Sequence, residues 1–121
     1  MAIYVFGNPE LEVDSLPIRI LPQLKEKFSE INFEIKDPNE DWDIPDELVI
    51  IDTVIGLKKP AVFDNLNDFQ PAPNLTLHDF DAYSKLKFLQ KLGKLKKVKI
   101  LGLPPEFSEN QALDFVSKNI K

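Results

Sequence analysis

Residues 47–52 read ELVIID, and this run is the most strand-like segment of the chain. Leucine, valine and isoleucine fill its middle, which is typical of a strand that is buried on both faces. The run ends in the carboxylate of Asp52. Because a carboxylate at the end of a buried strand loses hydration, Asp52 needs a partner such as a metal ion, a lysine or the amides of a helix N-terminus.

Four other runs predict strands around this one. The run AIYVF (2–6) is almost continuously apolar, NFEIK (32–36) alternates between apolar and polar residues, and KVKILGL (97–103) predicts a further strand. The run AVFDNL (61–66) is a candidate for a further short strand. Together the runs predict a sheet of about five strands.

Apolar residues recur at helical spacing between the first two predicted strands. Pro17 suits the first turn of this helix. The periodic apolar positions that follow it are Ile20, Leu21, Leu24 and Phe28. Proline is poorly suited to a helix interior, so Pro22 predicts a kink or marks the true start of the helix.

Two more helices are predicted in the second half of the chain. One covers residues 79–92 and stops at Gly93, since glycine favours helix C-termini. The other follows Ser108, a candidate N-cap. Its apolar face consists of Ala112, Phe115, Val116 and Ile120. The alternation of strands and helices predicts one three-layer α/β/α domain over residues 1–121, with a mostly parallel, about five-stranded twisted sheet.

The composition narrows the possible functions. The chain has 121 residues, of which 43% are hydrophobic and 29% are charged, as in ordinary globular domains. No apolar run approaches the roughly 20 residues that cross a bilayer, and the N-terminus lacks the features of a signal peptide. We therefore expect a cytoplasmic protein without a membrane partner. The net charge of −5 argues against a nucleic-acid partner, and the lack of cysteine excludes disulfides and thiolate zinc sites.

Two stretches concentrate charge of one sign. Seven lysines lie between residues 85 and 99, where a solvated helix face and strand edge is the favoured interpretation. The stretch DPNEDWDIPDE (37–47) carries six acidic residues. It is interpreted as a solvated surface, with a docking surface for a basic segment as the alternative.

Polar residues follow the predicted strands where a ligand would bind. In an open α/β sheet, ligands gather at the carboxyl ends of the strands. The acidic loop after the first strand carries Asp14, and Asp52 ends the central strand. His78 is the only histidine of the chain and precedes the helix predicted over residues 79–92.

Three kinds of site are compatible with these residues. Asp14, Asp52 and His78 could bind a divalent metal and leave positions open for catalysis. Asp14 and Asp52 could instead form a carboxylate pair that activates water. A hydroxyl nucleophile is set aside, because Ser15 and Thr53 do not lie in a GxSxG turn. The remaining alternative is that these residues neither bind metal nor catalyse a reaction. His78 and the two carboxylates would then be ordinary helix-cap and turn residues.

Three blocks of the sequence resemble the hydrogenase maturation proteases, which trim the large subunit of [NiFe] hydrogenases. YVFGNPELEVDSLPIRILPQL (4–24) is similar to the opening strand, GN turn, acidic loop and first helix of the family. DELVIIDTVIG (46–56) is similar to its central strand, which ends in an aspartate. LTLHDFDAYSKLKFLQKLGKLKKVKILGLPPEFS (75–108) is similar to its histidine turn, long helix, strand and proline-glutamate turn.

The resemblance implies a phosphorylase/hydrolase-like fold and an endopeptidase activity. Asp14, Asp52 and His78 fall on the family's metal ligands and would also be the catalytic residues, while Gly7 and Asn8 would contact the substrate. The metal would be nickel, supplied by the precursor of a hydrogenase large subunit, and no organic cofactor is implied. A neutral imidazole binds metal, so activity should fall as the pH drops through the pKa of His78.

The region after the second strand differs from the family. The family carries an aspartate followed by two glycines there, whereas this chain reads IKDPNEDW (35–42). The missing glycines favour a second hypothesis, in which the chain is a relative without protease activity. It would then be a binding or chaperone-like module for a metalloenzyme subunit.

Overall fold

A computed structural model of the chain describes residues 2–7, 10, 15–36, 47–54, 57–64, 88, 91–93 and 97–120. Its strands are β1 (Ala2–Val5), β2 (Asn32–Ile35), β3 (Glu47–Thr53), β4 (Ala61–Phe63) and β5 (Lys97–Leu103). Its helices are α1 (Leu16–Arg19), α2 (Leu21–Lys27) and α4 (Glu109–Ile120). Among the described residues, no helix has the length and apolar character to span a bilayer.

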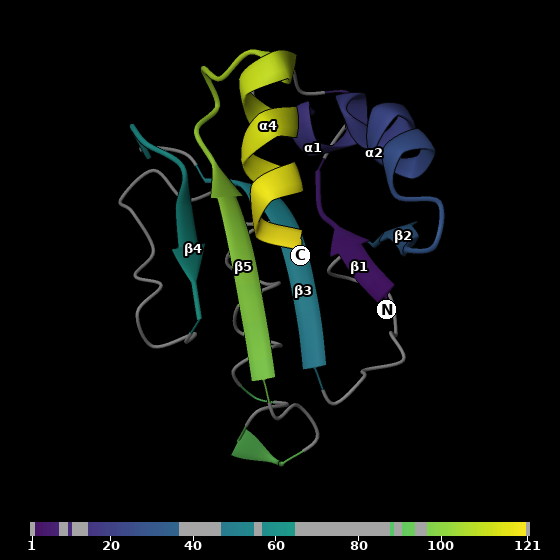
Figure 1. The fold of residues 1–121 in the computed structure, drawn as a ribbon. Coiled ribbons are helices and arrows are strands. Elements are labelled where there is room, and N and C mark those ends of the chain that lie inside the picture. Colours follow the sequence, from purple (N-terminus) through teal and green to yellow (C-terminus); the bar gives the residue numbers. More distant parts are fainter. Residues whose placement is uncertain are drawn as a thin grey trace.

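The strands form one sheet in the order β2-β1-β3-β5-β4. The pairs β1–β2, β1–β3 and β3–β5 are parallel, and β4 runs antiparallel to β5 (Figure 1). The longest pairing joins β3 to β5, from Glu47 opposite Lys97 to Thr53 opposite Leu103. The prediction of a mostly parallel, five-stranded α/β sheet is therefore confirmed.

The segment after β1 forms two short helices rather than one. Pro17 and Pro22 each stand in the first turn of a helix, where the missing proline N–H costs nothing. Ile20 ends α1 and precedes α2, and the amide of Leu24 donates to its carbonyl at 3.1 Å. Pro22 thus lies at the start of a new helix. This is one of the two alternatives that the sequence predicted, the other being a kink.

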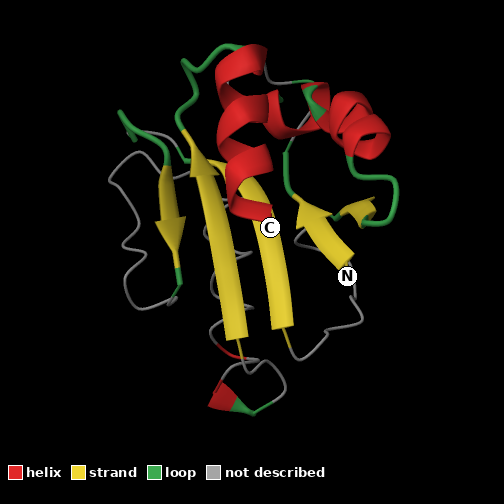
Figure 2. Ribbon diagram, viewed as in Figure 1, coloured by secondary structure: helices red, strands yellow, loops and turns green. Residues whose placement is uncertain are grey.

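Helices α1, α2 and α4 pack together on one face of the sheet (Figure 2). The core on that side combines strand residues such as Ile3 and Ile51 with Leu24 of α2 and Val116 of α4, and all four are fully buried. The opposite face is buried as well. Its core consists of Tyr4, Phe6, Leu48, Ile50, Val54, Val98 and Ile100.

The ends of the predicted helices follow the capping signals. The amide of Gln111 donates to Ser108 Oγ at 3.1 Å, and the amide of Ser108 donates to Gln111 Oε1 at 3.0 Å, which is a capping box. Gly93 has a φ of +78°, and the amide of Leu92 donates to the carbonyl of Phe88. The helix stop at Gly93 is therefore confirmed. The rest of the helix predicted over residues 79–92 lies largely outside the described residues.

Candidate functional site at the carboxyl ends of the central strands

The site follows from the order of the strands. β1 and β3 are neighbours, yet the chain leaves β1 toward β2 on one side and leaves β3 toward β4 and then β5 on the other side. In open α/β sheets, such a reversal leaves a crevice at the carboxyl ends of the two strands, where ligands bind. These ends lie at the top of Figure 1, close to α1.

Asp52 is the last but one residue of β3 and is fully buried. Because side chains alternate along a strand, its carboxylate shares the face of Leu48 and Ile50, opposite to the described helices. The carboxylate has interactions of its own, while its Oδ1 accepts no hydrogen bond from the described residues. A buried carboxylate at this edge of the sheet is therefore a candidate functional group.

Gly102 lies beside Asp52 on the neighbouring strand, as its direct partner in the β3–β5 register. A Cβ atom built on Gly102 would lie 3.0 Å from Cε2 of Phe63 and 3.1 Å from Cγ2 of Val54. These distances are too short for an ordinary contact. The lack of a side chain at position 102 therefore lets Phe63 and Val54 pack against the strand next to the carboxylate.

The other face of the same strand end carries hydroxyl groups. Thr53 and Ser15 are buried, with exposed fractions of 1% and 5%. Ser15 precedes α1, and its Oγ accepts a hydrogen bond from Nε of Arg19 at 3.0 Å. The guanidinium of Arg19 also lies 3.6 Å from a carboxylate oxygen of Glu109, which joins α1 to α4.

Two of the predicted site residues lie within the described part of the chain. Asp52 lies at the carboxyl end of β3, and the half-buried Gly7 follows the end of β1, so both lie at the strand reversal. Asn8, Asp14 and His78 lie outside the described residues, and their convergence on Asp52 stays a prediction. Within the described part of the chain, no group of three potential metal ligands occurs.

Sequence reasoning did not select Gly102 or set Thr53 apart as a binding residue. The glycine interrupts an otherwise apolar strand, KVKILGL, and such an interruption signals close approach of another group. Nothing in the sequence indicates that the hydroxyl of Thr53 lacks a partner, because that depends on the residues around it in the fold.

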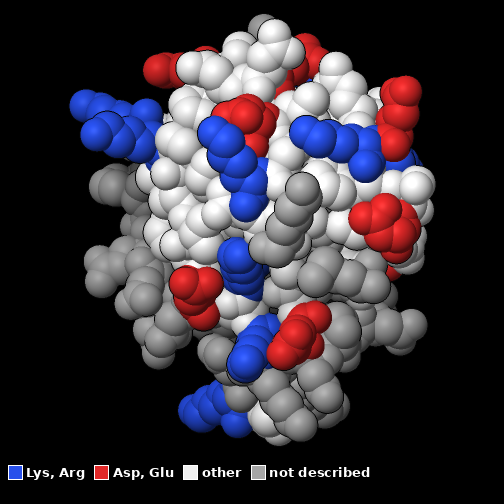
Figure 3. Space-filling view, in the orientation of Figure 1, with Lys and Arg blue, Asp and Glu red and all other residues white. Residues whose placement is uncertain are grey.

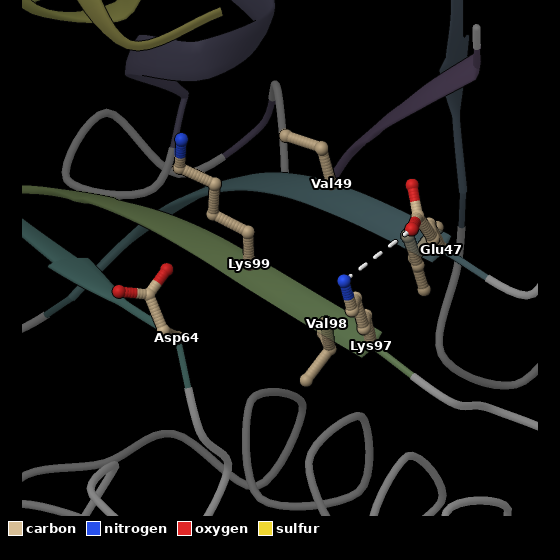
Figure 4. A pocket seen from close by; sticks show the side chains of 7 residues that line it. Glu47, Val49, Asp64, Lys97, Val98 and Lys99 are labelled. Atoms are coloured by element: carbon tan, nitrogen blue, oxygen red, sulfur yellow. Dashed lines mark ion pairs between the residues drawn. The ribbon is translucent and has the colours of Figure 1, made fainter.

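A separate hollow lies at the opposite, amino ends of β3 and β5 (Figure 4). Its volume is about 430 Å³, and it is lined by charged side chains of β3 and β5, among them Glu47 and Lys97, and by Asp64, which follows β4. Nζ of Lys97 lies 3.8 Å from a carboxylate oxygen of Glu47, and both side chains are more than 70% exposed. The hollow thus lies far along β3 from Asp52, and its charges are already paired in part.

The lysines at the start of β5 are held by neighbouring groups. Nζ of Lys99 donates to the carbonyl oxygen of Asn119 at 3.1 Å, near the end of α4. Figure 3 shows acidic side chains beside most of the basic ones on the face that carries α4. For Lys97 the interpretation as a solvated residue is confirmed, whereas Lys99 ties the strand to the helix.

Comparison with solved structures identifies the fold. The hydrogenase maturating endopeptidase HybD from E. coli superposes with a TM-score of 0.69 at 19% sequence identity. A second endopeptidase from Escherichia coli, solved in solution, superposes with a TM-score of 0.70 at 17% identity. Each comparison covers 98% of this chain and 89% of the other. The chain has the fold of a hydrogenase maturation protease.

An uncharacterized protein from Wolinella succinogenes is also similar, with a TM-score of 0.54 at 17% identity over 97% of this chain and 88% of that one. No protein-family model matches the chain, and no curated protein matches it. The resemblance noted in the sequence is therefore confirmed at the level of the fold.

Proposed function

We propose that this chain is an endopeptidase that removes the C-terminal extension of a [NiFe] hydrogenase large subunit after nickel has been inserted. The observation that carries the proposal is the buried carboxylate of Asp52 at the strand reversal of a HybD-like sheet. Buried titratable groups at such positions are candidates for functional sites. We also place the protein in the cytoplasm, where its substrate would be folded and loaded.

In this proposal Asp14, Asp52 and His78 bind the nickel that the substrate carries. The bound nickel supplies a Lewis acid near the peptide bond to be cut. The rigid pairing of β3 with β1 and β5 holds Asp52 in place, so its oxygen needs no reorganisation when the precursor docks. Gly7 and Asn8 would contact the substrate at the neighbouring end of β1. Water could be activated by the metal or by the carboxylate pair.

The test is a processing assay with a nickel-loaded large-subunit precursor from the organism that encodes this chain. The intact mass of the precursor should fall by the mass of the C-terminal extension, while precursor without nickel stays uncut. Asp52→Asn should remain folded and lose processing by about 100-fold or more, because the amide no longer offers an anionic ligand. Glu47→Gln is the matched control, since Glu47 is an exposed carboxylate at the other end of the same strand.

Equal processing by Asp52→Asn and the unmodified protein would rule out the proposed site. A second function, a binding module without protease activity, is favoured by the loss of the glycine pair in residues 35–42. In that case the precursor is bound and recovered with its mass unchanged. The mass measurement therefore separates the two functions in one experiment.

A further inference from the structure

The hydroxyl group of Thr53 is buried at the carboxyl end of β3. The residue is 1% exposed, and its Oγ1 has no hydrogen-bond partner among the residues that the structure describes. Folding normally pairs a buried hydroxyl, because an unpaired one forfeits the hydration that it has in the unfolded chain. We therefore expect the hydrogen-bond partner of this hydroxyl to be a group that is not among the described residues.

Thr53 lies at the strand reversal, on the face opposite to Asp52. Side chains alternate along β3, so Thr53 shares the face of Ile51 and lies on the side of the described helices. The parallel register pairs Val5 with Ile51, and its continuation by two residues brings Gly7 opposite Thr53. The carboxylate and the hydroxyl thus belong to one strand end and point to its two faces.

The surroundings of Thr53 favour an apolar residue of the same shape. Its partner across the sheet is Leu103, and the neighbouring Ile51 and Leu101 on that face are fully buried. Valine has the same branched shape and an equally high preference for strands. Threonine differs from valine here by a hydroxyl in place of a methyl group, and this hydroxyl is unfavourable in an apolar environment. Residues that do not fit their local environment are concentrated at functional sites.

The geometry does not suit a nucleophile. Thr53 is the last residue of a regular strand, and no described residue other than glycine has a positive φ. A nucleophile elbow, by contrast, presents its hydroxyl on a strained turn after a strand. A hydroxyl held in a strand is well placed to donate a hydrogen bond without taking part in bond cleavage.

We propose that Thr53 is a substrate-binding residue whose Oγ1 donates a hydrogen bond to a main-chain carbonyl oxygen of the precursor's C-terminal segment. The inference rests on the proposed function. Asp52 and Thr53 are the last two residues of β3, so a polypeptide that docks across the carboxyl edge of the sheet passes the ends of both side chains, one on each face. A polypeptide offers a carbonyl acceptor at every residue, and a threonine hydroxyl can donate a hydrogen bond to one of them.

The experiment compares Thr53→Val, which removes only the oxygen, with Thr53→Ser, which keeps it. Ser117→Ala is the matched control, because Ser117 Oγ of α4 is also buried and has no partner in the described part of the chain. The readouts are kcat and KM for processing of the nickel-loaded precursor, together with thermal melting. Thr53→Val should lower kcat/KM about 3- to 10-fold, the usual effect of one neutral hydrogen bond. Thr53→Ser and Ser117→Ala should process normally.

The melting temperature distinguishes a binding role from a structural one. If the hydroxyl forms its hydrogen bond only with the substrate, the melting temperature of Thr53→Val should be no more than about 2 °C below that of the unmodified protein. Valine has the same shape and replaces a hydroxyl that has no hydrogen bond among the described residues of the free protein. A larger drop combined with normal processing would show a structural partner, such as a buried water, and would overturn the inference.

The outcome for the unmodified protein separates this inference from the proposed function. If it processes the precursor and Thr53→Val does so equally well, only the role of Thr53 is wrong. If it binds the precursor without cutting, weaker binding by Thr53→Val supports the hydrogen bond and equal binding refutes it. If it neither binds nor cuts, both proposals fail.

Discussion

Asp52 and Gly102 face each other across β3 and β5, and Phe63 and Val54 occupy the space beside the glycine that a side chain would take. The carboxylate therefore lies beside the apolar side chains of Phe63 and Val54. These side chains can take up their positions only because residue 102 has no Cβ atom. This arrangement couples the packing of the edge strand β4, which contributes Phe63, to the environment of the proposed ligand.

Gly102→Ala should destabilise the protein by about 1–3 kcal/mol, because Phe63 and Val54 must move to admit the new methyl group. Urea unfolding followed by circular dichroism measures the change. The double variant with Phe63→Leu gives the control, since the shorter side chain removes Cε2 from the contact. If the two costs simply add, the contact with Phe63 is not the cause.

Ser108→Ala should cost about 1 kcal/mol of unfolding free energy, because the amide of Gln111 loses its acceptor at the start of α4. Gln111→Ala removes the reciprocal bond to the amide of Ser108. The double variant should cost less than the sum of the two single variants, as expected for one capping box. Fully additive losses in chemical denaturation would argue against reciprocal capping.

Lys99→Met should destabilise the protein by about 1 kcal/mol, since the ammonium group donates to the carbonyl of Asn119 near the C-terminus of α4. Lys97→Met is the matched variant on the same strand and should change stability by less than about 0.5 kcal/mol, because its ion pair with Glu47 is exposed. Parallel melting curves in low and high salt provide the measurement. Equal losses for both variants would contradict the assigned role of Lys99.

His78→Ala should abolish processing of nickel-loaded precursor while the protein keeps its melting temperature. His78 lies outside the described residues, so this prediction comes from the sequence alone. In the unmodified protein, activity should fall as the pH drops through the pKa of the imidazole, because a protonated ring cannot bind metal. Normal processing by the alanine variant would exclude the histidine from the site, and would leave the pair of carboxylates as the remaining mechanism.

Much of the sheet could be predicted because its signals are local. The runs around Ile3 and Ile50 are continuously apolar, as expected for strands buried on both faces, whereas Lys99 and Gly102 interrupt the run around Ile100. The position of Asp52 at the end of β3 followed from the run around Ile50. The antiparallel direction of β4 could not be predicted. The strand has only three residues, all half-buried, and their sequence does not indicate which strand they pair with.

The surroundings of the candidate site were harder to foresee because they depend on register. The pairing of Asp52 with Gly102 joins residues far apart in the sequence, and no local pattern encodes it. The unpaired hydroxyl of Thr53 depends in the same way on what packs above it. The proposed meeting of Asp14 and His78 with Asp52 comes from the family resemblance, and the described residues do not test it.

The longest pairing of the sheet, between β3 and β5, closes a loop of roughly 40 residues, and the entropy of such closure grows only with the logarithm of loop length. Doubling the connecting segment would cost about 0.6 kcal/mol in this description. Changes in the length of this segment that leave β4 in place are therefore expected to cost the pairing of β3 with β5 little. Evolution could remodel this segment to suit a different substrate while the strand that carries Asp52 stays where it is.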